Sequence, residues 1–547
     1  MFTITLDGQG VEVAPGQTVL EAARKLGLDI PTLCYLEKCT PMTSCLVCLV
    51  RVSLDGQSRL LPSCATPVAP GMVIESETAE VHDARRTALE MLLSDHVGDC
   101  LSPCHRICPL RMNIPVMIRQ IETGQLAGAI ATVRGALPLP GVLGRLCHAP
   151  CENGCRRGTL DQPAAIREME RYVADHDRKQ PQPYLPPREA ATGKSVLIVG
   201  AGPAGLAAAD FLLRAGHGCT VADRHDEAGG SLRQEVTAGN LPPEVLASDI
   251  EQIRRLGAQF MLRFEVGRDH PLESLVGAYD AVLLTTGELA RCKGAPGGLA
   301  VTPTGLKVDP VTSQTCLPGV FAAGSAVRPV KQLVRAMSDG VAAAACVHRF
   351  FFGAKGSRAG KPFSSVMGRL QEGEVNLFMV GPSPAGRLSP SGGPQAGYSD
   401  KEAPLEAARC LHCDCRAAGN CQLQRYSQIY GADPGRFRVQ RRRFEQHLQP
   451  GDVIFEPGKC IVCGVCVHLT QRASEPLGLT FIGRGFDVRV GAPLNHTLSE
   501  GLQKVAAECV EACPTGALAF KTARTGLNLP CHGLAAGPLK CPGCGPD

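Results

Sequence analysis

The spacing of four cysteines near the N-terminus constrains this chain more than any other feature. They follow the pattern C-x10-C-x2-C-x15-C, and they are Cys34, Cys45, Cys48 and Cys64. Thiolates are the ligands that iron–sulfur clusters require, whereas a zinc site usually has ligands in closer pairs. The chain has 27 cysteines among 547 residues, and similar groups continue as far as residue 544. We therefore expect several iron–sulfur clusters, which together would carry electrons.

The residues around these cysteines predict a small mixed domain. FTITLDG and VEVAPG read as a strand hairpin, TVLEAARKLGL as a helix, and LVCLVRVSL as a strand that leaves the cysteine loop. This order resembles the β-grasp ferredoxin domain of the large iron–sulfur subunit of respiratory complex I and of iron-only hydrogenases. The resemblance implies a domain over residues 1–79 with one 2Fe–2S cluster on the four cysteines. Cys39 lies inside the loop but outside the pattern, so we expect a spare thiol there.

A second group of cysteines predicts a helical domain over residues 80–180. Its patterns are H-x3-C-x3-C-x3-C-P and LCHAPCENGC, and they resemble the double-cluster domain that begins the glutamate synthase small subunit and dihydropyrimidine dehydrogenase. In that family the first pattern is C-x2-C-x4-C-x3-C-P, and an imidazole can replace a thiolate on cluster iron. The resemblance implies one 4Fe–4S cluster on His96, Cys100, Cys104 and Cys155, and another on Cys108, Cys147, Cys151 and Glu170. The alternatives are that His96 only bonds a cluster sulfur and that Glu170 lies on a helix surface.

A dinucleotide-binding pattern follows a proline-rich linker and predicts a flavin domain over residues 194–352. The apolar strand SVLIV runs into G-x-G-x-x-G, a helix follows, and the next strand ends at an acidic residue. Such glycines let the backbone approach a pyrophosphate, and the acid binds ribose hydroxyls. The later segments YDAVLLTTGE and LPGVFAAGSAV resemble the second half of two-dinucleotide flavoproteins and imply bound FAD, although Ser325 replaces their usual aspartate. The expected FAD-binding residues are Gly200, Gly202, Gly205, Asp223, Gly230, Arg233, Gly287, Gly324 and Ser325.

This domain lacks room for the NAD(P)H-binding domain that glutamate synthase-like flavoproteins insert after the TTG segment. A second dinucleotide domain needs on the order of 100 residues, and far fewer separate Gly287 from Gly324. We therefore expect the flavin to exchange electrons with clusters or with a partner protein. Four isolated cysteines in this region are expected to pack in the core, and they are Cys219, Cys292, Cys316 and Cys346.

Two more cysteine groups follow a linker over residues 353–405 and predict a C-terminal iron–sulfur domain over residues 406–547. The first group favours a 4Fe–4S cluster, with zinc as the alternative, on Cys410, Cys413, Cys415 and Cys421. The second group resembles a bacterial-type ferredoxin, which implies a 4Fe–4S cluster on Cys460, Cys463, Cys466 and Cys513. Cys509 has no place in this pattern. The last three cysteines, which could bind zinc or nothing, are Cys531, Cys541 and Cys544.

Composition and charge argue against several classes of function. The net charge is only +4, and no basic patch indicates binding of nucleic acid. We expect no signal peptide and no membrane span, because no apolar run reaches the roughly 18–20 residues that a span needs. A reducing, cytoplasmic location is expected, in which cysteines bind metal rather than form disulfides. No set of side chains indicates an acid, base or nucleophile, so we expect no catalytic residue.

In order, these domains predict a multidomain α+β and α/β chain: a β-grasp 2Fe–2S ferredoxin, a helical double-cluster domain, a Rossmann-like FAD domain and a C-terminal ferredoxin-like domain. This order resembles iron–sulfur flavoproteins related to the large subunit of ferredoxin-dependent transhydrogenases. The resemblance implies an electron-transfer subunit of a bacterial oxidoreductase, with FAD, one 2Fe–2S cluster and three to four 4Fe–4S clusters. Its partners would be redox subunits, such as an NADH-oxidising subunit, a hydrogenase or a formate dehydrogenase, and its flavin could branch electron flow. The alternatives are a self-sufficient NAD(P)H-dependent oxidoreductase and an assembly scaffold with a vestigial flavin site.

Overall fold

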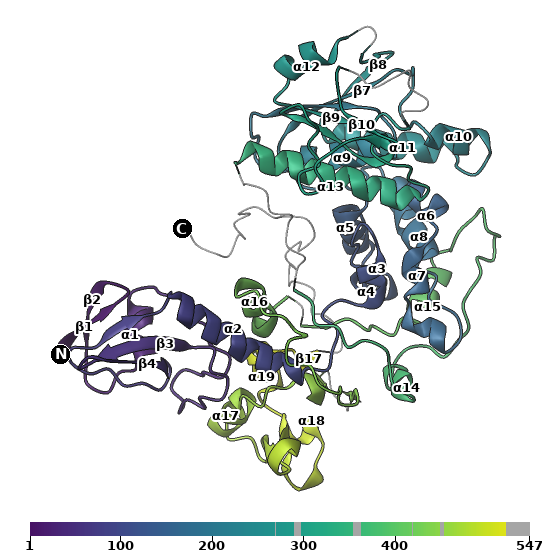
Figure 1. The fold of residues 1–547 in the computed structure, drawn as a ribbon. Coiled ribbons are helices and arrows are strands. Elements are labelled where there is room, and N and C mark those ends of the chain that lie inside the picture. Colours follow the sequence, from purple (N-terminus) through teal and green to yellow (C-terminus); the bar gives the residue numbers. More distant parts are fainter. Residues whose placement is uncertain (268–269, 289–296, 354–362, 418, 449–452, 521–547) are drawn as a thin grey trace. The chain divides into compact units, whose positions relative to one another are not determined.

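The computed structural model describes residues 1–267, 270–288, 297–353, 363–417, 419–448 and 453–520 (Figure 1). The chain folds into two compact units, each built from segments that are distant in the sequence. Among the described residues, unit 1 comprises 1–102, 363–380, 413–417, 419–448 and 453–520, and unit 2 comprises 103–267, 270–288, 297–353 and 381–412. One division between the units, at Ser102 and Pro103, therefore falls among the predicted cluster ligands of the helical domain.

Unit 1 begins with a five-stranded mixed sheet and one helix. The strands are β1 (Phe2–Leu6), β2 (Gln9–Val13), β3 (Leu49–Leu54), β4 (Gln57–Pro62) and β5 (Val73–Glu75), in the order β2-β1-β5-β3-β4. β1 and β5 run parallel, and the other neighbouring strands run antiparallel. Helix α1 (Val19–Lys25) begins with a capping box between Thr18 and Glu21, and its apolar residues pack into the core of the sheet. The predicted ferredoxin-like fold of this part is confirmed.

A long helix and the C-terminal segments complete unit 1. Helix α2 (Ala79–Ser94) packs against α16 (Gln422–Ile429). The other helices are α14 (Glu374–Phe378), α17 (Val465–Arg472), α18 (Leu498–Gly501), α19 (Ala506–Ala512), η4 (Pro457–Lys459), η5 (Gly485–Asp487) and η6 (Pro493–Asn495). One sheet has the order β13 (His447–Leu448), β14 (Val453–Phe455), β17 (Leu518–Phe520), and another pairs β15 (Thr480–Ile482) with β16 (Arg489–Gly491). One hydrophobic core holds residues from both ends of the sequence, among them Leu33, Leu89, Leu423 and Val465.

The first part of unit 2 is helical. Its elements are α3 (Pro103–Ile107), α4 (Ile114–Glu122), α5 (Leu126–Ala136), α6 (Pro140–Leu146), α7 (Pro150–Asn153), η1 (Arg156–Thr159) and α8 (Ile166–Arg178), joined by α15 (Glu402–Ala407) from later in the chain. Helices α6 and α8 touch closely, because a Cβ on Gly144 would lie 2.7 Å from the Cα of Arg171. The buried face of α8 includes Met169 and Val173. A glycine at the contact thus lets the two helix backbones approach each other.

The second part of unit 2 is a Rossmann-like α/β layer structure. Its parallel sheet has the order β12 (Val320–Ala322), β9 (Ala281–Leu284), β6 (Ser195–Val199), β7 (Gly218–Asp223), β8 (Gln259–Leu262). The helices are α9 (Pro203–Arg214), α10 (Leu232–Thr237), α11 (Pro243–Arg255), α12 (Leu272–Ala278), η3 (Gly324–Ala326) and α13 (Leu333–Phe351), and β10 (Val301–Thr302) pairs with β11 (Gly305–Leu306). Helices α9 and α13 lie side by side (Figure 1), and a Cβ on Gly340 would lie 2.1 Å from the carbonyl oxygen of Ala204.

Within the described residues, no single helix is both long enough and apolar enough to cross a membrane. Helices α5 and α6 together pass the same test by length and composition alone, with an 83° bend at their junction. Their apolar residues, such as Ile130 and Val142, are buried in the core of unit 2.

Candidate iron–sulfur and dinucleotide sites

The four cysteines of the N-terminal loop gather in the interior of unit 1. The Sγ atoms of Cys34 and Cys45 lie 3.3 Å apart, and all four residues are at most 4% exposed. The loop curls around them with residues in the left-handed region, including Leu46 at φ 53°. A hydrogen bond from the neighbouring thiol lowers the pKa of Cys34 to about 5 and that of Cys48 to about 7. Four buried, adjacent thiols fit a 2Fe–2S cluster.

The predicted C-terminal ferredoxin site is a cavity in unit 1. Its lining contains all four predicted ligands and apolar walls: Cys460, Cys463, Cys466, Cys513, Phe455, Ile461, Val490 and Leu518. Left-handed backbone at Val462 and Gly464 curls the C-x2-C-x2-C segment, and the Val462 N–H donates to Cys460 Sγ at 3.4 Å. Burial raises the pKa of the Cys460 thiol to about 11, and binding of a metal centre would favour the thiolate. This donor set fits a 4Fe–4S cluster.

Two residues near this cavity are not predicted ligands: Thr470, which stands where the C-x2-C-x2-C-x3-C pattern has its fourth cysteine, and Cys509. The buried hydroxyl of Thr470 donates to the Val467 carbonyl at 2.9 Å and accepts from the Leu479 N–H at 3.1 Å. Cys509 is also buried but does not line the cavity, and its Sγ lies 3.9 Å from the carbonyl oxygen of Cys466. Thr470 therefore ties α17 to the following loop.

The two cluster sites of unit 1 are neighbours. The side chain of Met42, in the N-terminal loop, lies 3.2 Å from the position of a Cβ on Gly464. Cys34 and Cys463 belong to one hydrophobic core. Burial, with a smaller contribution from nearby thiols that include Cys34, raises the pKa of Cys463. Only a thin layer of side chains therefore separates the two predicted cluster sites.

A further cavity, in unit 2, is lined by the predicted ligands of one helical-domain cluster. These are Cys108, Cys147, Cys151 and Glu170, and the apolar walls include Met112, Ile114, Leu137, Leu143 and Val334. Glu170 projects from α8 and is 6% exposed, so it is not a helix-surface residue. Burial and the nearby Glu152 raise the pKa of Glu170 to about 8. A carboxylate in such surroundings needs a positive partner, which cluster iron would supply, and the donor set fits a 4Fe–4S cluster.

Two of the three other cysteines of the predicted helical domain, Cys104 and Cys155, lie in unit 2 beside Cys410. Cys104 is in α3, which packs against α7 just before Cys155. Cys104, Cys155 and Cys410 all pack on the same hydrophobic core. Burial, with a smaller contribution from the Cys410 thiol, raises the pKa of Cys155. Residues 381–412 therefore bring a cysteine from late in the sequence to the helical domain.

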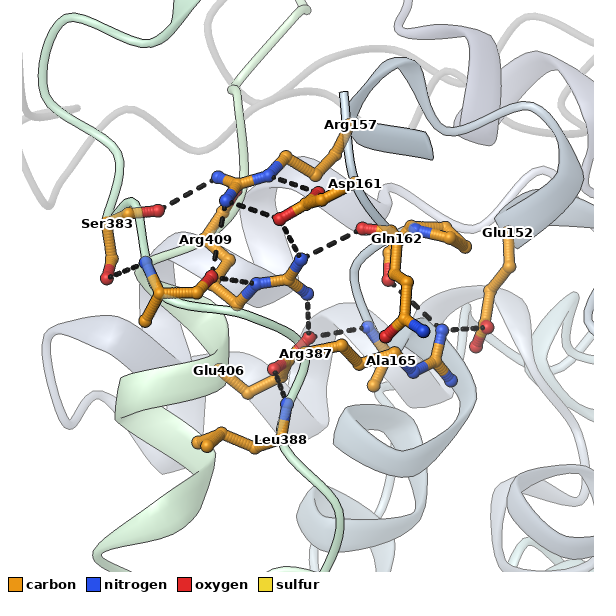
Figure 2. Close-up of polar contacts among 12 residues, drawn as sticks. Glu152, Arg157, Asp161, Gln162, Ala165, Ser383, Arg387, Leu388, Glu406 and Arg409 are labelled. Atoms are coloured by element: carbon orange, nitrogen blue, oxygen red, sulfur yellow. Dashed lines mark hydrogen bonds and ion pairs between the residues drawn. The ribbon is translucent and has the colours of Figure 1, made fainter. Parts of the chain in front are cut away.

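A buried network of arginines and carboxylates holds this late segment in unit 2 (Figure 2). Asp161 accepts hydrogen bonds from Arg157 Nε at 2.8 Å and from Arg409 Nη2 at 3.0 Å. Arg409 also donates to Glu406 at 2.8 Å, and two backbone N–H groups donate to the same carboxylate. Arg157, Glu406 and Arg409 are at most 2% exposed. The network fixes Arg409, and with it the adjacent Cys410, beside η1.

Cys100 lies in unit 1, next to cysteines of the C-terminal group. The Cys415 N–H donates to the carbonyl oxygen of Cys100 at 3.4 Å, and the Ser365 N–H donates to Cys100 Sγ at 3.3 Å. Burial and the Cys415 thiol raise the pKa of Cys100 to about 12. Burial, followed by the thiols of Cys415 and Cys100, raises the pKa of Cys421. Cys100, Cys415 and Cys421 therefore form one neighbourhood.

His96 precedes Cys100 by one short loop in unit 1. Its Nδ1 is buried and has no hydrogen-bond partner within the described residues. Burial and the nearby Lys459 lower the pKa of His96 to about 3, so its imidazole is neutral. A neutral, unpartnered ring nitrogen is able to bind metal.

Two predicted ligand groups are thus divided between the units. Unit 1 holds His96, Cys100, Cys413, Cys415 and Cys421, and unit 2 holds Cys104, Cys155 and Cys410. Neither predicted set of four is gathered within one unit. Among the described residues, no group of three or more histidine, cysteine or acidic side chains is close enough to hold a single metal ion. The spacing of cysteines along the chain carries no signal of this division, because it does not say which distant segment packs beside which.

The predicted dinucleotide site lies at the carboxyl ends of β6 and β7. A Cβ on Gly200, which has φ +112°, would lie 2.4 Å from the Thr285 carbonyl oxygen, and one on Gly205 would lie 1.9 Å from the Gly200 carbonyl oxygen. These two glycines are required for the turn to pack on the sheet. No atom lies closer than 4.0 Å to the position of a Cβ on Gly202. Gly202 therefore keeps open the space before the N-terminus of α9, where a pyrophosphate binds in this type of fold.

The acidic residue at the end of β7, Asp223, bonds the backbone of the glycine turn after β6. Asp223 is 7% exposed. Its Oδ2 accepts from the Ala201 N–H at 2.7 Å, and its Oδ1 accepts from the His225 N–H at 2.9 Å. His225 Nδ1 also lies 2.8 Å from Oδ1, so it is Oδ2 that keeps a second lone pair for a ribose hydroxyl. Asp223 thus fits its predicted role.

The other predicted dinucleotide residues differ in how well they fit. Gly230 lies against Gly202, since its Cβ would be 2.8 Å from the Gly202 Cα. Gly324 and Ser325 form η3 shortly before α13. The guanidinium of Arg233 is paired with Glu227 at 2.8 Å and bonded to a backbone carbonyl. Gly287 follows β9 at φ +81°, in open space.

Helix α13 faces both parts of unit 2. Its residue Val334 lines the cavity of Cys108 and Glu170. One turn later, Ser338 Oγ donates to the carbonyl oxygen of Pro109 at 3.1 Å. The helix that follows the dinucleotide segment FAAGS therefore forms one wall of a predicted cluster site.

The isolated cysteines do not all pack in the core as predicted. Cys219 and Cys346 are buried, but Cys316 is exposed, so its predicted packing role is wrong. It lies in the loop between β11 and β12, where the next residue, Leu317, packs against the core but the cysteine itself does not. Cys39 is partly buried. The remaining isolated cysteines, which lie outside the described residues, are Cys292, Cys531, Cys541 and Cys544.

Three family models match consecutive parts of the chain. They are a 2Fe–2S iron–sulfur cluster binding domain over residues 1–79, dihydropyrimidine dehydrogenase domain II with a 4Fe–4S cluster over residues 78–182, and an NAD(P)-binding Rossmann-like domain over residues 198–260. The chain is a multidomain iron–sulfur protein. It combines a 2Fe–2S domain, a helical 4Fe–4S domain and a Rossmann-like domain, which confirms the predicted architecture of these three parts.

Curated relatives are redox proteins. The chain is 38% identical over 207 residues to the NADP(+)-dependent formate dehydrogenase subunit beta of Moorella thermoacetica, covering 34% of this chain and 29% of the relative. It is 33% identical over 233 residues to the glutamate synthase (NADPH) small chain of Escherichia coli, and this match covers 42% of this chain and 49% of the relative. It is 34% identical over 189 residues to the NADPH-Fe(3+) oxidoreductase subunit beta of Geobacter sulfurreducens, and this match covers 34% of this chain and 28% of the relative. The chain thus spans less than half the length of each of these relatives.

Among solved structures, the chain is similar to an NAD+-reducing NiFe-hydrogenase in the H2-reduced state. The identity is 40%, the match covers 17% of this chain and 39% of that one, and the TM-score is 0.16. The similar segment is therefore short.

Proposed function

We propose that this chain is an electron-transfer subunit of a multi-subunit bacterial oxidoreductase, in which iron–sulfur clusters exchange electrons with FAD. The observation that carries this proposal is the cavity of unit 2, whose wall joins Cys108 and Glu170 to Val334 of α13. The hydrogen bond from Ser338 to Pro109 holds the same helix against the cluster segment. A cluster in this cavity would border the dinucleotide-binding part without an intervening domain.

Unit 1 supports the same function. The N-terminal four-cysteine site and the Cys460–Cys513 cavity share a hydrophobic core and touch through Met42 and Gly464. Clusters transfer one electron at a time, and a flavin exchanges one or two. The residues of the chain would hold these groups at fixed positions and keep water away from them, because most of the cysteines lie in apolar, buried surroundings.

We propose FAD as the dinucleotide. Gly202, Gly205 and Asp223 would hold the pyrophosphate and the ribose, and these residues suit any dinucleotide. FAD is favoured by the later segment, in which Gly324 and Ser325 precede α13, and by the cluster cavity on the other side of that helix. Ser325 would offer a hydroxyl where an aspartate is usual, so we expect FAD to bind less tightly than in flavoproteins with the aspartate.

The partners are proposed to be other redox subunits. The matched parts of formate dehydrogenase and glutamate synthase subunits support this class of partner, and NADH-oxidising, hydrogenase or formate dehydrogenase subunits are the candidates. A reducing compartment such as the cytoplasm suits the chain, because the described cysteines are free thiols.

Cofactor analysis of the anaerobically purified full chain tests the proposal. We expect about 14–18 iron atoms per chain, from one 2Fe–2S cluster and three or four 4Fe–4S clusters, together with about one FAD. Low-temperature EPR of the reduced chain should show several interacting signals. An iron content near two atoms per chain, or a chain without flavin, would contradict the proposal and favour a scaffold.

One observation favours a second candidate, a self-sufficient NAD(P)H-dependent oxidoreductase. The family model over residues 198–260 is described as NAD(P)-binding. A nicotinamide dinucleotide in this site would leave no place for FAD among the described residues of the sheet. Flavin content, with NAD(P)H binding measured on the same sample, separates the two candidates.

A further inference from the structure

We propose that the segment Cys410–Cys421 supplies ligands to two different clusters instead of one. Cys415 and Cys421 join His96 and Cys100 on a cluster in unit 1, and Cys410 joins Cys104 and Cys155 on a cluster in unit 2. The inference deepens the proposed function, on which it rests, by assigning the ligands of two of its clusters. It replaces both four-residue sets that the spacing of the sequence suggests.

The unit 1 set is assembled by backbone contacts. The Cys415 N–H bonds the Cys100 carbonyl at 3.4 Å. On the other side, Cys100 and Ser365 are linked twice, because the Cys100 N–H donates to the Ser365 carbonyl at 3.2 Å and the Ser365 N–H donates to Cys100 Sγ at 3.3 Å. These contacts hold Cys100 and Cys415 beside each other.

Cys421 reaches the same neighbourhood from the start of α16. Its Sγ accepts from the Gln424 N–H at 3.4 Å and lies 3.7 Å from the Pro514 carbonyl oxygen. Cys415 lies on the same side of this loop, since its Sγ is 3.2 Å from the position of a Cβ on Gly516. The loop after Cys513 therefore backs both thiols, and this cluster would lie next to the one held by Cys513.

His96 completes the set as the fourth ligand. Its buried Nδ1 lacks a hydrogen-bond partner within the described residues, and an orphaned buried nitrogen is costly unless something binds it. The loop that carries His96 and Cys100 lies flat on η4: the Val97 N–H donates to the Gly458 carbonyl at 2.7 Å, and a Cβ on Gly98 would lie 2.6 Å from the Lys459 side chain. The loop therefore has little freedom to move away from this position.

A buried cation stands beside this set. Lys459 is 3% exposed and pairs with Glu456. Its side chain covers Gly98, midway between His96 and Cys100 along the loop. A lysine is seldom buried without negative charge around it, and one carboxylate together with an anionic cluster would supply that charge. Lys459 is thus placed to balance part of the negative charge of a cluster on this set.

The unit 2 set rests on a different observation. The network of Arg157, Asp161, Glu406 and Arg409 holds the segment before Cys410 with hydrogen bonds of 2.8–3.0 Å in the interior of the helical part (Figure 2). The backbone is tied as well, because Arg157 Nη1 donates to the Arg409 carbonyl at 3.2 Å. Arg157 follows Cys155 by two residues, so the network draws Cys410 to Cys155. Cys410 would supply the third thiolate there.

The two arrangements make opposite predictions for a pair of variants. Cys410→Ser and Cys415→Ser are prepared in the anaerobic full-length chain and compared by potentiometric EPR and Mössbauer spectroscopy. We expect Cys415→Ser and Cys421→Ser to remove or alter one 4Fe–4S signal, and Cys410→Ser and Cys104→Ser to remove or alter a different one. His96→Cys, which keeps four ligands, should retain the signal that Cys415→Ser removes and shift it to lower potential. Cys219→Ser, a buried cysteine far from these groups in the sequence, is the control and should change no signal.

The inference is wrong if Cys410→Ser and Cys415→Ser affect the same EPR signal and His96→Cys shifts a different one. In that case the four cysteines of the segment Cys410–Cys421 bind one cluster. The iron content does not distinguish the arrangements, because both allow the same number of clusters. A wild-type chain without any 4Fe–4S signal would contradict the proposed function itself, so the two failures are distinguishable.

Discussion

Ser338, on the helix after the dinucleotide segment, donates a hydrogen bond of 3.1 Å to the carbonyl oxygen of Pro109, the residue after Cys108. The bond crosses from the Rossmann-like part of unit 2 to its helical cluster part. With Val334 in the wall of the same cavity, it makes α13 a shared support for both predicted cofactors. A shift of α13 would therefore alter the surroundings of both predicted cofactor sites.

Glu170 is expected to bind cluster iron, because it lies in a cavity with three cysteines. Glu170→Ala should lose or convert that cluster, whereas Glu170→Cys should keep it at a lower potential. EPR and iron analysis measure both effects. Glu168→Ala, on the same helix but outside the cavity lining, is the matched control. An unchanged spectrum in Glu170→Ala would show that the carboxylate is not a ligand.

Gly202 and Gly205 should respond differently to substitution by valine. Gly202 has free space around its Cβ position, so Gly202→Val should fold normally but bind no flavin, since the side chain enters the space of the pyrophosphate. A Cβ on Gly205 would lie 1.9 Å from a carbonyl oxygen, so Gly205→Val should lose stability as well as flavin. Flavin content and thermal unfolding distinguish the outcomes. Full flavin in folded Gly202→Val would place the dinucleotide elsewhere.

Arg409 should matter for the stability of unit 2. Arg409→Met removes the arginine partner of the buried Glu406 carboxylate, and breaking a buried ion pair typically costs about 3–5 kcal/mol. The exposed pair of Arg425 with Asp29, at 3.4 Å, is a control, and Arg425→Met should cost about 0–1 kcal/mol. Denaturant unfolding followed by circular dichroism compares the two. Equal, small effects would mean that the network does not hold the segment.

Local patterns predict the individual parts of this chain well. C-x2-C-x2-C at Cys460 and the G-x-G-x-x-G turn at Gly200 are built from neighbouring residues, so their spacing already specifies how the backbone curls. The grouping of Cys100 with Cys415 could not be predicted in this way, because it depends on which distant segments pack together. The sequence also left undecided whether Glu170 is buried, since the residues around it suit either face of a helix. The exposure of Cys316 could not be predicted either, because it lies in a loop, where no periodic pattern indicates which side chains are buried.

The Rossmann-like part should lose stability in mild acid because of His217. This residue is fully buried and bonded to His348 at 2.9 Å, and burial, with His348, lowers its pKa to about 4. Between that value and the ordinary 6.5, the unfolded chain binds more protons than the folded one, so stability falls as the pH drops through this window. Thermal unfolding at about pH 7 and about pH 5 should show a smaller difference in His217→Gln than in the wild type. An identical pH dependence would exclude this role.

The central claim is that electrons reach the flavin through the clusters and not from a nicotinamide bound to this chain. Its most direct test is anaerobic mixing of the purified chain with NADPH or NADH, and separately with a one-electron donor such as reduced ferredoxin, while the flavin absorbance is followed. We expect the donor to bleach the flavin, and we expect this bleaching to slow strongly in Glu170→Ala, whose predicted cluster lies against α13. NADPH or NADH alone should leave the flavin oxidised. Rapid bleaching by either nucleotide alone would contradict the account and make the chain a self-sufficient oxidoreductase.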